Sequence, residues 1–144
     1  MEINQVAIEK LIADKTGIDP KIIGSSKIER AIRNRWQTIN LVNNVSYFKL
    51  LQNSPTELQA LIEEIVVPET WFFRDYSPFE FLLKYIQAQS VTAPRSTPWR
   101  LLSVPCSTGE EPYSIAMTLL EAGLSPEQFT IDAVDISENA IEQA

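Results

Sequence analysis

Residues 100–135, RLLSVPCSTGEEPYSIAMTLLEAGLSPEQFTIDAVD, decide the fold class of this chain. The apolar run at 100–105 predicts a short buried strand, and residues 129–134 predict a second strand. Between them, a turn containing Gly109 leads into a helix with apolar residues at helical spacing. Strand, turn, helix and strand in this order predict the first part of an α/β domain with a parallel, Rossmann-like sheet. Because two strands cannot bury a sheet by themselves, we expect the domain to be incomplete in this chain.

The sequence before this stretch predicts an α-helical region followed by a connecting segment. Apolar periodicity and helix-start signals predict helices over residues 3–14, from Ser25 or Ser26 as N-cap to about residue 39, over 45–53, after Ser54-Pro55, and over 77–89. Two prolines and small polar residues predict a loop over 90–98. We therefore expect a helical N-terminal docking domain (1–66), a linker and helix (67–98) and an incomplete α/β domain (99–144).

Composition excludes several classes of protein. The chain has 44% hydrophobic and 22% charged residues, as soluble globular proteins do. It contains no histidine and one cysteine, so an internal disulfide, a cysteine-based metal site and a His-dependent hydrolase are excluded for this chain. It shows no signal peptide and no apolar run of membrane-spanning length, so a cytoplasmic location is expected.

Charge is distributed unevenly along the sequence. The net charge of −7 argues against nonspecific nucleic-acid binding. Residues 21–35, however, hold five basic residues and a single acidic one, a local net charge of +4. On a helix whose other face carries Ile28 and Ile32, these cations form either a docking surface for an acidic partner or an ordinary solvated face.

The first strand-to-helix turn is where a parallel sheet of this type binds its ligand. There is no G-x-G-x-x-G sequence, which disfavours a dinucleotide. Glu110 and Glu111 suit the positive end of the helix dipole and tolerate a cationic ligand better than a pyrophosphate. Asp135, after the second strand, is placed to bind ribose hydroxyls. Together they point to an adenosine-type ligand; the structural alternatives are helix capping by Ser107 or Thr108 and by Asp135.

Two longer motifs carry a resemblance to a known family. Residues 107–116 (STGEEPYSIA) resemble the S-adenosylmethionine motif of the CheR-type chemotaxis receptor methyltransferases, and residues 69–75 (ETWFFRD) resemble that family's T-x-F-F-R element. The upstream helical region is similar to the family's N-terminal domain. The likeness thus covers nearly the whole chain.

The resemblance implies a protein-glutamate O-methyltransferase that uses S-adenosylmethionine and acts on chemoreceptor helices. It assigns cofactor contacts to Thr70, Arg74, Glu111 and Asp135, and no catalytic side chain. Glu111 would meet the methionine ammonium, Arg74 its carboxylate and Asp135 the ribose. Partner binding falls to the basic residues of the second helix, which are Lys27, Arg30, Arg33 and Arg35. Arg74 could instead be a surface arginine, and Phe72 and Phe73 are expected to pack mostly in the core.

The reaction of the family fits a chain without histidine. A glutamate carboxyl has a pKa of about 4.3 and is already ionised at pH 7, so its attack on a sulfonium methyl group needs no general base. The sequence departs from the family at Pro68, Pro105 and Cys106, where contacts to the cofactor are in doubt. Two alternative functions are a non-catalytic docking module for acidic helices and a nucleoside-binding oxidoreductase, which the missing glycine motif disfavours.

Overall fold

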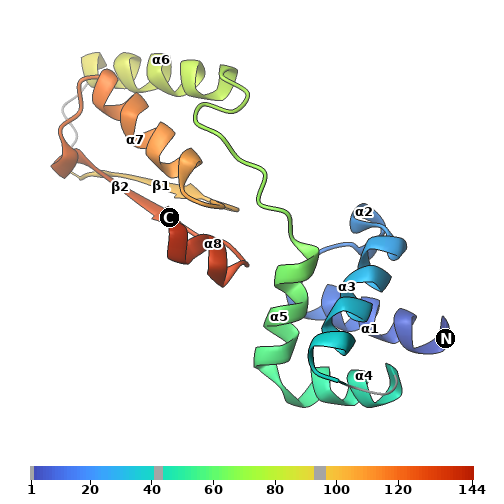
Figure 1. Ribbon diagram of the computed structural model, residues 1–144. Helices are drawn as coiled ribbons and strands as arrows, with labels where there is room; N and C mark the ends of the chain where they lie inside the picture. Colours follow the sequence, from blue (N-terminus) through green and yellow to red (C-terminus); the bar gives the residue numbers. More distant parts are fainter. Residues whose placement is uncertain (1, 41–43, 93–96) are drawn as a thin grey trace. The chain divides into compact units, whose positions relative to one another are not determined.

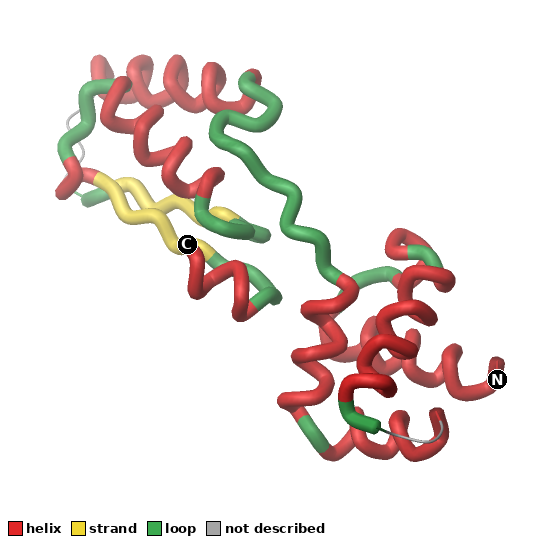
Figure 2. Tube along the Cα trace, viewed as in Figure 1, coloured by secondary structure: helices red, strands yellow, loops and turns green. Residues whose placement is uncertain are grey.

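The computed structural model describes residues 2–40, 44–92 and 97–144. They form two compact units, Met1–Val67 and Pro68–Ala144 (Figure 1). In its described part the first unit is helical, and both strands lie in the second unit (Figure 2). The helices of the first unit are α1 (Glu2–Thr16), α2 (Pro20–Ile23), α3 (Ser25–Thr38), α4 (Asn44–Asn53) and α5 (Pro55–Ile65).

The first unit has its own hydrophobic core. Helix α3 packs on α5, and α4 packs on both α1 and α5. The apolar stripe predicted for α3 lies there, because residues three and four apart lie on one face of a helix. On α1 the buried residues are Ile8 and Ile12, whereas Val6, which was expected on the apolar face, is exposed. Aliphatic side chains and one tyrosine from four helices make up this core: Ile8, Ile12, Ile28, Ala31, Ile32, Tyr47, Leu51, Leu61 and Ile65.

Local capping sets the helix ends of this unit. The Ser54 hydroxyl accepts a hydrogen bond from Glu57 N, which confirms the predicted start of α5. The expectation of an N-cap at Ser25 or Ser26 is wrong, because both serines are already helical and Gly24 precedes them. Asp19 caps the short helix α2, which sequence periodicity did not predict, and that helix ends at Gly24 with a φ of +90°. Glycine adopts this φ without strain, so one residue can end α2 and begin α3.

The second unit contains a two-stranded parallel sheet, as expected. Strand β1 (Trp99–Ser103) pairs with β2 (Phe129–Ala133), and the connection runs through α7 (Glu110–Glu121) and a short 3-10 helix, η1 (Pro126–Gln128). The strands are shorter than predicted at their carboxyl ends, where Pro105 has no N–H to donate. Helix α8 (Glu138–Gln143) follows β2.

Strand β1 is not buried on both faces, which corrects the sequence-based expectation. Its Trp99 and Leu101 side chains turn to the core, whereas Arg100 and Leu102 are exposed. Successive side chains on a strand point to opposite faces, and the helices α6 (Ser77–Thr92) and α7 pack on one face only. The core of this unit combines residues from these helices and from the turn after α7 with the inward face of both strands: Ile86, Leu119, Leu124, Leu82, Trp99, Leu101, Ile115, Phe129 and Ile131.

Helix α6 runs further than predicted. It ends at Thr92, so residues 90–92 of the expected loop are helical. After Pro78, in the first turn of the helix, the next proline is Pro94, so no proline stops the helix earlier. Residues 93–96 of that loop lie outside the described residues. Within the described part of the chain, no helix has the length and apolar character needed to cross a membrane.

Candidate functional site

The carboxyl ends of β1 and β2 are held together beyond the strands. Val134 N donates a hydrogen bond to Ser103 O (3.0 Å), and Cys106 N donates to Val134 O (2.9 Å). This pairing brings Asp135 beside the first strand-to-helix turn, where Ser107 N donates to Asp135 Oδ2 at 2.7 Å. The structure therefore joins the two features that the sequence singled out for a nucleoside ligand.

Asp135 keeps capacity for a ligand. Its other oxygen, Oδ1, accepts a hydrogen bond from Ser137 N at 2.9 Å. Ser137, not Asp135, caps α8, because its hydroxyl accepts the hydrogen bond from Ala140 N. An ionised carboxylate offers about four acceptor positions, and the half-buried Asp135 uses two of them here.

The turn that leads into α7 contains a glycine and an unpaired buried hydroxyl group. Gly109 stands at the start of α7 with a φ of +100°, and no side chain caps this helix, so capping by Ser107 or Thr108 is wrong. The Thr108 hydroxyl instead bonds to Glu110 Oε2 at 2.7 Å. The Ser107 hydroxyl is buried and has no hydrogen-bond partner in the described structure. An unpaired buried polar atom beside Asp135 fits a site that completes its hydrogen bonds with a polar ligand.

Glu111 is oriented by the end of the first strand. The hydroxyl of the fully buried Ser103 donates to Glu111 Oε1 at 2.6 Å, while Glu111 itself is exposed. Sequence reasoning did not single out Ser103. Burial raises the pKa of the neighbouring Cys106 thiol, and the charges of Asp135 and Glu111 raise it further. Cys106 is therefore a protonated, buried side chain at neutral pH, as expected of a small hydrophobe.

The ETWFFRD segment forms a turn that is tied to α7. Phe73 N donates a hydrogen bond to Ser114 Oγ at 2.9 Å, and the Phe73 ring packs edge-on against Phe79 at 5.4 Å between centroids. Phe73 is half-buried, but Phe72 is 53% exposed, so the expectation that both pack mostly in the core is wrong for Phe72. Phe73 itself has a φ of +55°, in the left-handed region.

Arg74 and Thr70 flank this turn. The Arg74 guanidinium lies 4.7 Å from the centre of the Trp71 ring and donates from Nη1 to Glu69 O at 2.7 Å. Arg74 is exposed and Thr70 is half-buried. No hydrogen bond or ion pair in the described residues joins either of them to Glu111 or Asp135. All four predicted cofactor residues thus lie in the second unit, in two groups. Among the hydrogen bonds of the described residues, the one from Phe73 N to Ser114 Oγ joins the two segments that carry them.

The first unit carries the predicted partner-binding residues, and Arg35 departs from the expectation. Its guanidinium makes two hydrogen bonds to Glu57 inside the helical unit, from Nε at 2.9 Å and from Nη2 at 2.8 Å. The Tyr47 hydroxyl donates to the same carboxylate at 2.9 Å. The Arg35 side chain is only 18% exposed. Arg35 therefore binds Glu57 within the helical unit, and we remove it from the candidate docking surface.

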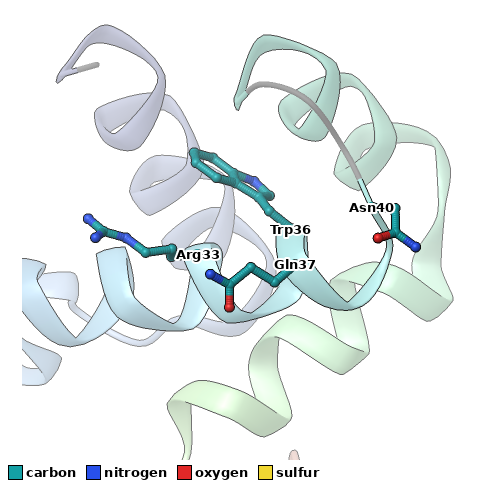
Figure 3. A pocket seen from close by; sticks show the side chains of 4 residues that line it. All are labelled: Arg33, Trp36, Gln37 and Asn40. Atoms are coloured by element: carbon teal, nitrogen blue, oxygen red, sulfur yellow. The ribbon is translucent and has the colours of Figure 1, made fainter.

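The remaining cations lie on the outer face of α3. Arg30 and Arg33 are exposed and Lys27 is half-buried; Arg33 pairs with Glu29 at 2.8 Å. Figure 3 shows a shallow hollow near the end of α3, lined by Arg33, Trp36, Gln37 and Asn40. All four side chains offer N–H donors, and the indole N–H of Trp36 is buried without a partner in the described structure.

The second unit matches a known family. Residues 68–144 match the family model described as the CheR methyltransferase, SAM binding domain. This match confirms the resemblance, the fold class and S-adenosylmethionine as the cofactor of the domain.

Similar proteins span the helical unit as well. The chain is 46% identical over 136 residues to a probable biofilm formation methyltransferase of Pseudomonas aeruginosa, covering 94% of this chain and 32% of that protein. A second probable biofilm formation methyltransferase, from Pseudomonas putida, is 40% identical over 98% of this chain and 33% of its own length. The chemotaxis protein methyltransferase of Escherichia coli is 31% identical over 95% of this chain and 47% of its own length. The chain thus spans about a third to a half of these relatives.

Proposed function

Because this chain belongs to the CheR methyltransferase family, we propose that the protein methylates glutamate side chains of a chemoreceptor or a related signalling protein. The observation that carries the proposal is the hydrogen bond from Ser107 N to Asp135 Oδ2, which brings the proposed ribose-binding aspartate to the family's motif. The names of the relatives, which refer to chemotaxis and to biofilm formation, support a signalling protein as the substrate.

Different residues of the second unit bind different parts of the cofactor in this proposal. Asp135 accepts hydrogen bonds from the ribose hydroxyls, with Ser107 Oγ as an additional partner. Glu111 pairs with the ammonium group and Arg74 with the carboxylate of the methionine portion through charge-assisted hydrogen bonds. Thr70 adds a hydroxyl near the same end. The exposed Arg74 must leave its contact with Glu69 O, or share it, to reach the ligand.

The chemistry requires little proton transfer from this chain. Bound S-adenosylmethionine supplies a methyl group on a positively charged sulfur. The accepting glutamate is ionised at neutral pH, since its ordinary pKa is about 4.3. The chain's contribution is therefore to hold the cofactor in line with the attacking carboxylate and to exclude water while opposite charges neutralise.

Isothermal titration with S-adenosylhomocysteine tests the cofactor site. We expect Asp135→Ala to weaken binding by about tenfold or more, since it removes charge-assisted hydrogen bonds. Asp132→Ala is the matched control: Asp132 lies on β2, three residues before Asp135, and pairs with Arg100 on the surface. Equal affinities of wild type and Asp135→Ala, or equal losses in both variants, would contradict the assignment of Asp135.

The helical unit supplies the docking surface for the substrate in this proposal. Lys27, Arg30 and Arg33 give the outer face of α3 a positive charge, which complements an acidic receptor helix. The compact core of this unit also favours the second candidate function, a docking module that binds such helices without catalysis. Both candidate functions use the same surface to bind the partner, and a measurement of cofactor-dependent methyl transfer distinguishes them.

Binding to an acidic helical peptide from a receptor cytoplasmic domain tests this surface. We expect Arg30→Glu and Arg33→Glu each to weaken binding by about tenfold at low salt, and the effect to shrink as salt screens the charges. Lys10→Glu is the control for Arg33→Glu, because Lys10 forms a similar exposed ion pair with Asp14 on α1. If Lys10→Glu weakened peptide binding equally, the loss would reflect the net charge of the protein and not a docking surface on α3.

A further inference from the structure

Ser114 joins two parts of the second unit through a single hydroxyl group. Its Oγ donates a hydrogen bond to Glu110 O, one turn earlier on α7, at 2.6 Å. The same oxygen accepts the hydrogen bond from Phe73 N at 2.9 Å. Ser114 is fully buried, so both hydrogen bonds are shielded from water.

The turn that Ser114 contacts has a backbone that few residues adopt. Phe73 and Asp75 have φ values of +55° and +53°, in the left-handed region. Residues with a Cβ occupy this region at a cost, and a bulky aromatic residue there needs support from its surroundings. The packing of Phe73 on Phe79 holds the ring. The hydrogen bond to Ser114 holds the backbone.

No other hydrogen bond in the described residues ties this turn to the part of the unit that carries the cofactor motif. The remaining hydrogen bonds of residues 69–76 stay within the segment or reach the first turn of α6, as Arg74 N to Trp71 O and Phe79 N to Tyr76 O do. Ser114 follows Glu111 by three residues on α7. The contact therefore connects the residue before Arg74 to the helical turn after Glu111.

We propose that Ser114 is a positioning residue for the methionine end of the cofactor. By fixing Phe73 N, it holds Thr70 and Arg74 at a set distance from Glu111, so that groups from two segments act on one ligand. Ser114 does not touch the cofactor in this scheme. This inference rests on the proposed cofactor site, and it predicts that the loss of Ser114 affects only ligands that carry the amino-acid portion.

Thr118 provides a matched control on the same helix. It is buried, and its hydroxyl donates to Ser114 O, four residues earlier, at 2.8 Å. Like Ser114, it therefore donates a hydrogen bond to the carbonyl oxygen four residues earlier on α7. Unlike Ser114, it has no hydrogen bond to the ETWFFRD turn in the described structure. A comparison of Ser114→Ala with Thr118→Val separates the contact with Phe73 from the removal of a buried hydroxyl in α7.

The test measures the affinities of the protein for two ligands by calorimetry. S-adenosylhomocysteine carries the amino-acid portion, and 5′-methylthioadenosine lacks it. We expect Ser114→Ala to weaken S-adenosylhomocysteine binding by about tenfold, as for one net hydrogen bond, and to leave 5′-methylthioadenosine within about twofold. Ser114→Thr, which keeps the hydroxyl, and Thr118→Val should leave the ratio of the two affinities unchanged.

Hydrogen exchange at the Phe73 amide gives a readout that does not depend on a ligand. Protection in the wild type, reduced in Ser114→Ala and kept in Thr118→Val, supports the contact. A freely exchanging Phe73 amide in the wild type overturns it. An unchanged affinity ratio in Ser114→Ala overturns the positioning role even if the amide is protected. Failure of the wild type to bind either ligand overturns both the positioning role and the proposed cofactor site.

Discussion

At the residue scale, Glu57 is a buried charge in the helical unit. It is 8% exposed and accepts hydrogen bonds from Arg35 and Tyr47. Burial acts to raise the pKa of Glu57, but the hydrogen bonds from Arg35 and Tyr47 and the charge of Arg35 outweigh it, so the pKa lies below its ordinary value. Burial and the hydrogen bond to Glu57 raise the pKa of Tyr47, which stays a protonated donor.

The first prediction follows from this network. Glu57→Gln should lower the free energy of unfolding at pH 7 by about 3 kcal/mol, because it leaves the half-buried Arg35 without its counter-charge. Since the folded pKa of Glu57 is depressed, its stabilising contribution is present above the unfolded pKa of about 4.3 and is lost as pH falls through the folded value. Urea unfolding at pH 7 and pH 3 measures both effects.

Glu29→Gln serves as the control for that prediction. Glu29 pairs with Arg33 on the surface of the same helix, and an exposed pair contributes about 0–1 kcal/mol. A loss for Glu57→Gln no larger than that for Glu29→Gln, or one that persists in full at pH 3, would show that the network contributes little through charge.

At the element scale, the start of α7 depends on Gly109. A Cβ at this position would lie 3.2 Å from the Tyr113 ring and 3.2 Å from Ala144 Cβ, and the φ of +100° is itself unfavourable for alanine. Gly109→Ala should therefore destabilise the second unit by about 1–3 kcal/mol and weaken S-adenosylhomocysteine binding. Chemical denaturation and calorimetry measure the two effects.

Gly123→Ala isolates the contribution of contact. Gly123 has a similar φ of +93°, but nothing lies within 4 Å of an added Cβ. Both variants carry the conformational cost, and only Gly109→Ala carries the clash and lies in the candidate site. Equal destabilisation with unchanged ligand affinity would mean that the turn is a structural feature alone.

Element types were more predictable from the sequence than the contacts between elements. Apolar periodicity predicted α5 and the order of β1, α7 and β2, because it reports which face of an element is buried. It did not predict α2, because a helix of four residues is too short to show a repeating apolar pattern. The roles of Ser114 and Arg35 depend on partners 41 and 22 residues away, and spacing within one element does not encode such pairs.

At the scale of the whole molecule, the chain is built as two units with separate cores. The buried residues of the first core, and the Arg35–Glu57–Tyr47 network, all lie within Met1–Val67. The second core is formed by residues after Pro68. A unit that encloses its own apolar residues and pairs its own buried charges has what it needs to fold alone.

The last prediction is that residues 1–67 fold without the rest of the chain. The fragment should be helical by far-ultraviolet circular dichroism and should unfold cooperatively in urea, with a slope of about 1 kcal/mol/M, as for a small domain. Glu57→Gln should destabilise the fragment and the whole chain by amounts that agree within about 0.5 kcal/mol, since independent sites add. Gly109→Ala in the whole chain should leave the unfolding of this unit unchanged. A fragment that melts without cooperativity would show that the second unit contributes to the first core, and the docking surface would then depend on the cofactor-binding unit for its structure.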